Sequence, residues 1–153
     1  MWQSNILKQL LDLPWAEHIT TSIAHTLMLP LYLEREFERS VFLLDYHEFK
    51  IEPGFIGQIA RYYKQGALYY LSAIRNLISK YFAFKCDPNP IFNNDAELLQ
   101  LKKIDTQLYQ ILEAYFIRWA RYDFTADLLS EYRDFNADFY IGLKPWMNGK
   151  RFG

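Results

Sequence analysis

The sequence predicts an all-α fold, a single-domain helical bundle of five to six helices that spans residues 1–153. Apolar or aromatic residues recur in alternating steps of four and three over residues 56–81. This seven-residue repeat is typical of a helix that packs along its length against other helices. The same spacing returns over residues 98–129, where Asp105 is the one polar position, and residues 91–141 contain neither glycine nor proline.

The N-terminal third is expected to form three helices that are separated by prolines. Ser4 is a suitable N-cap for the first helix, and Pro14 is expected to end it. A second helix is predicted over residues 15–29. Pro30 suits the first turn of a third helix, over residues 31–50.

A long helix is predicted over residues 55–83, after a proline-glycine turn. Gly66 lies inside it. Because glycine has no side chain, we interpret it as a site where a neighbouring helix or ring approaches the backbone closely. Residues 84–94 are rich in proline and asparagine and are expected to form a loop. The two long elements on either side of this loop should therefore run antiparallel as a helical hairpin.

The second long helix is predicted over residues 95–122. Asn94 and Glu97 have the spacing of a capping box at its start. A single helix of about 40 residues would be about 60 Å long, so we expect a break near residues 123–125. The glycines and proline after residue 142 predict an irregular tail.

The repeat also predicts which side chains are buried, because one face of each long helix must meet the other. The seam between the two helices is expected to bury eight side chains: Tyr63, Tyr70, Ile74, Leu77, Leu108, Leu112, Tyr115 and Trp119.

Composition places few limits on function. The chain has 153 residues, enough for one domain with its own core. Its 12 Tyr, 12 Phe and 4 Trp are a surplus of rings, which either build the core or line a binding surface. The single cysteine, Cys86, allows no intrachain disulfide. No signal peptide or transmembrane helix is recognised, so a cytoplasmic location is expected.

Charge is segregated along the chain. Between Glu52 and Asp87 there is no acidic residue, while both flanking stretches are acidic. Basic residues interleaved with rings are typical of single-stranded nucleic-acid binding. In this alternative an RNA or DNA strand would contact four cations: Arg61, Lys64, Arg75 and Lys80. The other interpretation is that the basic helix exchanges salt bridges with acidic neighbours.

Catalytic and metal motifs are weak in this sequence. His18, His25 and His47 lie near carboxylates, but no Glu-x-x-His pair of a di-metal bundle is present. Cys86 has no histidine close in sequence, and no phosphate-binding glycine loop occurs. The sequence thus predicts no catalytic residue, metal or cofactor. A metal-binding helical-bundle enzyme that uses His18 and His25 remains the second alternative.

The C-terminal residues resemble a peptide that docks into a partner. Trp, Met and Arg are favoured anchors at protein interfaces. The candidate partner-binding residues are Trp146, Met147, Lys150, Arg151 and Phe152. The competing interpretation is that Trp146 folds back onto the chain's own core.

Together these observations predict a non-enzymatic protein-binding module: an adaptor, a secretion chaperone, or an inhibitor or immunity-type protein that neutralises a partner. Its partner would be another protein, recognised through an aromatic-rich helical surface. A homodimer built on the same rings is the alternative to a foreign partner.

Overall fold

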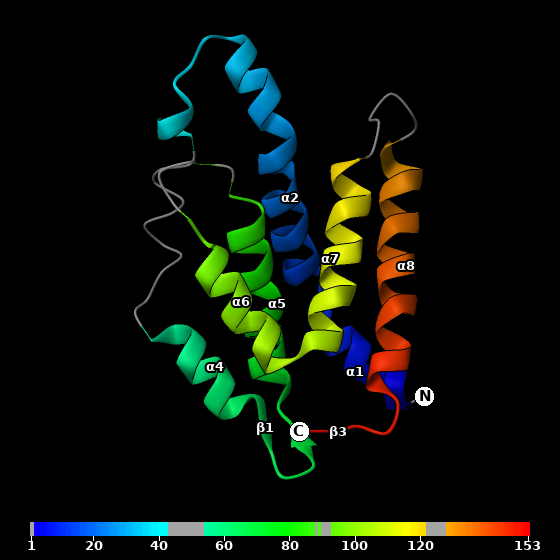
Figure 1. Ribbon diagram of the computed structural model, residues 1–153. Helices are drawn as coiled ribbons and strands as arrows, with labels where there is room; N and C mark the ends of the chain where they lie inside the picture. The colour runs from blue at the N-terminus through cyan, green and yellow to red at the C-terminus, as the bar shows by residue number, and fades with distance from the viewer. Residues whose placement is uncertain (1, 43–53, 88, 90–92, 122–127) are drawn as a thin grey trace.

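The computed structural model describes residues 2–42, 54–87, 89, 93–121 and 128–153 (Figure 1). The described elements follow one another as α1 (Trp2–Leu10), α2 (Leu13–Glu34), the 3-10 helix η1 (Arg39–Val41), α4 (Phe55–Tyr63), β1 (Lys64–Gln65), β2 (Leu68–Tyr69), α5 (Leu71–Lys85), α6 (Asp95–Ile104), α7 (Thr106–Ala120), α8 (Leu128–Met147) and β3 (Arg151–Phe152). The predicted all-α class is confirmed. The described residues hold seven α-helices rather than five or six.

The predicted single helix over residues 55–83 is wrong. A small hairpin divides it, with Lys64 paired to Tyr69 and Gln65 to Leu68. Gly66 stands at the turn with a φ of +59°, a backbone conformation that glycine adopts without a Cβ penalty. The interpretation of Gly66 as a close-approach site is also wrong, because a Cβ built there would have nothing within 4 Å.

The second predicted long helix is also divided, at Asp105. α6 ends at Ile104 and α7 begins at Thr106, with Asp105 as the N-cap between them. Its carboxylate accepts a hydrogen bond from the Leu108 N–H at 2.8 Å, which satisfies a backbone donor of the new first turn. The antiparallel hairpin of two long rods is therefore replaced by four shorter helices. The break expected near residues 123–125 lies outside the described residues.

Asn94 does precede α6 as predicted, but it does not form a capping box. Its side chain makes no cap hydrogen bond and instead donates to the Phe84 carbonyl at 3.3 Å. The amide therefore ties the start of α6 back to the end of α5.

At the N-terminus the prolines do not separate helices. α1 begins before Ser4, so Ser4 is not its cap. Pro14 lies in the first turn of α2, whose N-cap Asp12 accepts from the Trp15 N–H at 3.2 Å. Pro30 lies inside α2 rather than at the start of a new helix. The third predicted helix is replaced by the end of α2 and by η1, and residues 43–53 lie outside the described part.

The tail is ordered rather than irregular. α8 continues through Gly142 and Pro145 to Met147. β3 then pairs in parallel with β2, so that Leu68 lies opposite Arg151 and Tyr69 opposite Phe152. The C-terminal residues thus complete a three-stranded sheet with the hairpin between α4 and α5 (Figure 1).

The predicted core is confirmed at seven of its eight positions, and Tyr70 is half-buried. Side chains from all seven α-helices contribute to one hydrophobic cluster. Much of that cluster is aromatic: Tyr81 meets Tyr109 edge to face at 5.1 Å between ring centroids. Tyr115 stacks on Phe139 at 4.3 Å. Many of the surplus rings therefore lie inside the molecule, where they bury large areas.

Candidate functional site

One concave feature of the surface is a cleft of about 720 Å³. It is lined by α4, by the β1–β2 hairpin, by the α6–α7 junction, and by Lys150 near the end of the sequence. In Figure 1 these segments lie at the lower end of the molecule, where the small sheet is formed. A volume of this size is within the range of small-molecule sites in proteins.

Asp105 joins the walls of this cleft. Besides capping α7, it accepts hydrogen bonds at Oδ2 from the Tyr63 hydroxyl and from the Trp146 indole N–H, both at 2.9 Å. Burial, together with the charge of Asp105, raises the pKa of Tyr63 far above its ordinary value, so this hydroxyl remains a donor at accessible pH. The carboxylate therefore holds α4, α7 and α8 in one arrangement.

Three lysines surround the cleft: Lys64, Lys103 and Lys150. The ammonium groups of Lys64 and Lys150 lie 4.9 and 5.5 Å from the centroid of the Tyr69 ring. Lys150 also lies 4.6 Å from the Trp146 ring centroid and donates to the Trp146 carbonyl. Within the described part of the chain, none of the three lysines forms an ion pair with a carboxylate.

The four cations of the nucleic-acid hypothesis are not gathered on this cleft, because only Lys64 lines it. Arg75 pairs with Asp12 at 2.8 Å and lies over Trp15. Lys80 lies over the Phe55 ring, and Arg61 over Tyr62 in its own helix. The competing interpretation was that the basic segment forms salt bridges with acidic neighbours. One such pair is present, since Lys85 of α5 pairs with Glu113 of α7 at 3.3 Å.

The predicted partner-binding tail has a different position from the one expected. Trp146 is 0% exposed and Met147 is 1% exposed, so neither side chain is available to a partner in this fold. Trp146 folds back onto the core, as the competing interpretation holds. Phe152 packs on the rings of Tyr69 and Trp146. Only Arg151 of the five predicted residues is exposed, and Lys150 and Phe152 are half-buried.

A second group of exposed apolar side chains was not recognised in the sequence. The end of α2 and η1, residues 28–41, are here called the α2 arm. Four large side chains on it are more than half exposed: Met28 52%, Leu31 61%, Phe37 54% and Val41 51%. In Figure 1 the end of α2 extends beyond the ends of α5 and α7, opposite to the cleft.

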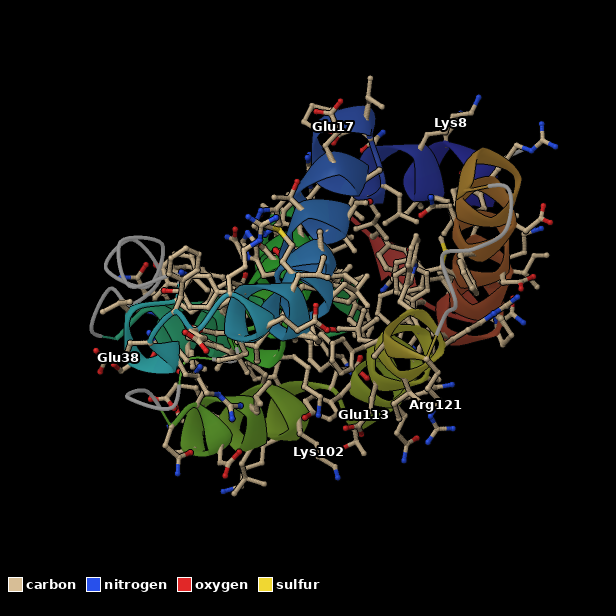
Figure 2. The ribbon with its side chains drawn as sticks, turned by 90° about the horizontal axis from the view of Figure 1, so that it is seen from above. Lys8, Glu17, Glu38, Lys102, Glu113 and Arg121 are labelled. Carbon is tan, nitrogen blue, oxygen red and sulfur yellow. The ribbon has the colours of Figure 1, made fainter. Side chains whose placement is uncertain are left out.

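The α2 arm is held in a defined shape. The Tyr32 ring packs against Phe37 and Phe42, with centroids 5.0 and 4.8 Å apart. Its hydroxyl donates to the Glu38 carbonyl at 3.1 Å. Glu36 adopts a φ of +59°, which turns the chain back against α2. The apolar side chains are thus presented by a folded segment, and Figure 2 shows Glu38 at the outer edge of the molecule.

The histidines do not form a metal centre in the described part of the structure, where no group of three His, Cys, Asp or Glu is placed to hold an ion. His18 instead meets Ser79, with 3.0 Å between Nε2 and Oγ. A serine beside an imidazole is one element of nucleophilic catalysis, which also needs a group that orients the ring. Among the described residues, the ring also packs at nearly a right angle against the Trp15 ring, with 5.6 Å between the ring centroids.

Burial lowers the pKa of His18, a hydrogen bond with the backbone of Ser79 opposes this effect, and the charge of Lys80 adds to it. The unfolded chain therefore binds more protons than the folded chain below the ordinary pKa of 6.5. Stability should be fully present above that pH and should fall as the pH drops toward the lowered value. Urea unfolding from about pH 5 to pH 7.5 should show this slope, and His18→Gln should flatten it. An equal slope in both proteins would contradict the assignment.

No described helix combines the length and the apolar character that a membrane crossing requires. No family model, curated protein or solved structure matches this chain. Its function is therefore inferred from its own side chains and their geometry.

Proposed function

We propose that this chain is a non-enzymatic protein-binding module that acts as an adaptor, a secretion chaperone or an inhibitor, and that the α2 arm is its contact surface. The observation that carries the proposal is the group of four large apolar side chains left in water on one short segment. Burying one such side chain contributes about 1.5–3 kcal/mol. Grouped exposed apolar side chains mark interaction sites on many folded proteins.

This proposal keeps the predicted function but assigns the partner-binding surface to the α2 arm instead of the C-terminal residues. Trp146 and Met147 are interior residues, so the anchors are instead Leu31 and Phe37 with their neighbours. The location proposed for the module is the cytoplasm, a proposal that rests on the single cysteine of the sequence.

The chemistry of the α2 arm suggests the kind of partner. Met28 and Leu31 are three residues apart on α2 and lie on one helical face. Charged residues of both signs follow them along the arm: Glu34, Arg35, Glu36, Glu38 and Arg39. An apolar helix face with a mixed charged rim suits a partner with an apolar groove, which is the helix-in-groove mode of recognition.

The test compares two equally exposed apolar residues on different helices, Leu31 at 61% and Ile141 at 58%. A photo-crosslinking residue at position 31, introduced in cells of the source organism, should capture one recurring protein that position 141 does not. For that protein, Leu31→Lys should weaken binding by about 10- to 100-fold, because the apolar burial is lost. Calorimetric titration measures the effect, and Ile141→Lys serves as the matched control.

Self-association is distinguished by sedimentation. The wild type is compared with Leu31→Lys over a range of concentrations. If the wild type forms a dimer that Leu31→Lys dissociates, the partner is a second copy of this chain and not a different protein. If position 31 captures nothing beyond position 141, or if both lysine variants bind equally well, the α2 arm is not the contact surface.

The nucleic-acid alternative receives less support. Arg75 is paired with Asp12, and the four predicted cations contact different elements, whereas a nucleic-acid strand needs a continuous basic track.

A further inference from the structure

We propose that the cleft between α4, the β1–β2 hairpin and the α6–α7 junction binds a small phosphate-bearing anion through Lys64, Lys103 and Lys150. The inference is independent of the α2 arm, which lies at the other end of the molecule (Figure 1). It adds a ligand site to a protein-binding module.

The first argument is charge. Three cations elsewhere in the described structure are paired with carboxylates: Arg75 with Asp12, Lys85 with Glu113, and Arg118 with Asp138. The three lysines of the cleft have no such partner in the described residues. Three ammonium groups around one concave site produce a positive potential, and a concave shape focuses that potential on a bound anion.

The second argument is the state of Asp105, the one acidic side chain among the described residues that line the cleft. Its oxygens already accept from Leu108, Tyr63 and Trp146. These three donors stabilise the carboxylate in place, and three lysines against this one carboxylate leave the lining with a formal charge of +2. Asp105 therefore serves the fold and does not form an ion pair with any of the lysines.

The third argument is preorganisation. Each lysine is close in sequence to a residue of the Asp105 network: Lys64 follows Tyr63, Lys103 precedes Asp105 by two residues, and Lys150 follows Trp146 by four. The network therefore holds the three backbones that carry the lysines before any ligand arrives. A site that needs little reordering loses less entropy when it binds.

The chemistry of the lining selects the ligand class. Lysine binds phosphate as a point charge, and the amides of Gln100 and Gln107 in the lining supply further donors. The cleft of about 720 Å³ has room for a diphosphate or a mononucleotide. A long polyanion would need cations beyond the cleft, and Arg75 is already paired on another face.

The experiment is calorimetric titration of the full chain with inorganic pyrophosphate, and separately with ADP, at low and at physiological salt. Binding that weakens with salt is expected for both probes, because both carry the diphosphate. Lys103→Gln should weaken binding at least about 5-fold. Lys103 is exposed, so this variant should fold, and an unchanged thermal unfolding curve would establish that.

Lys8→Gln is the matched control, since Lys8 is an exposed lysine on α1, and Figure 2 shows it at the opposite edge of the molecule from Lys102 of α6. It should bind as the wild type does. If ADP binds and pyrophosphate does not, the ligand of the cleft is a phosphate ester. If only pyrophosphate binds, the ligand is an inorganic phosphate. A decathymidylate strand is titrated as a third probe. The proposal is overturned if neither pyrophosphate nor ADP binds, if Lys8→Gln and Lys103→Gln lose affinity equally, or if only the decathymidylate strand binds.

Discussion

Asp105→Ala is expected to lower the free energy of unfolding by about 3–5 kcal/mol. The substitution removes the N-cap of α7, which contributes about 1 kcal/mol. It also leaves the Tyr63 hydroxyl and the Trp146 indole N–H without their acceptor, and each buried donor without a partner costs about 1–3 kcal/mol. Urea unfolding followed by far-ultraviolet circular dichroism measures the change.

Asp12→Ala is the control, because Asp12 is also an N-cap and accepts from the Trp15 N–H. Its other contact is the partly exposed pair with Arg75, so the expected loss is about 1–2 kcal/mol. Asp105→Asn should cause a loss of unfolding free energy between those of Asp105→Ala and Asp12→Ala. The amide keeps an oxygen that caps α7, but its NH₂ group faces the donors of Tyr63 and Trp146. Equal losses for the two alanine variants would show that Asp105 is only a cap.

Trp146→Ala is expected to lower the free energy of unfolding by about 3–5 kcal/mol. The indole is fully buried, packs on Phe152 and donates to Asp105. Its removal leaves a cavity that α8 cannot close without moving. Trp146→Phe keeps most of the ring and loses the charge-assisted hydrogen bond, so a loss of about 2 kcal/mol is expected. The same urea titration measures both variants.

The Trp146 result also separates the two interpretations of the tail. If the tail were a free docking peptide, Trp146→Ala would leave stability unchanged. A double-mutant cycle with Asp105→Ala adds a second criterion, since residues that share a hydrogen bond should lose less together than the sum of the single losses. Strict additivity would mean that the indole and the carboxylate do not interact.

The core could be predicted from the sequence because the seven-residue apolar repeat continues on both sides of the β1–β2 hairpin and of the helix break at Asp105. The hairpin segment, Lys64 to Tyr70, is one heptad long, so it leaves the phase of the pattern unchanged on its two sides. Tyr63 and Ile74 therefore still face the core although they belong to different helices. For the same reason, periodicity alone could not reveal the hairpin. Gly66 itself was the available signal in the sequence, but a glycine inside a helical pattern does not report whether its φ is positive.

The cleft could be predicted only in part. Lys64 and Lys150 were recognised as candidate residues, each for a different partner, and Asp105 was recognised as the breach in the apolar seam. Their proximity depends on two long-range events, the pairing of β2 with β3 and the bonds of Asp105 to Tyr63 and Trp146. The α2 arm was missed because Pro30 predicted a new helix there, whereas the residues after Pro30 continue α2 as far as Glu34.

The parallel pairing of β3 with β2 has a consequence for biosynthesis. Leu68 meets Arg151, so a nascent chain emerging from the ribosome carries α4, α5, α6 and α7 well before this strand pair can close. Until α8 follows, Asp105 lacks its indole donor, and the neighbouring rings remain open to water or to chaperones. Closing so long a loop is slow, so the final docking of the C-terminal segment should be the late step of maturation.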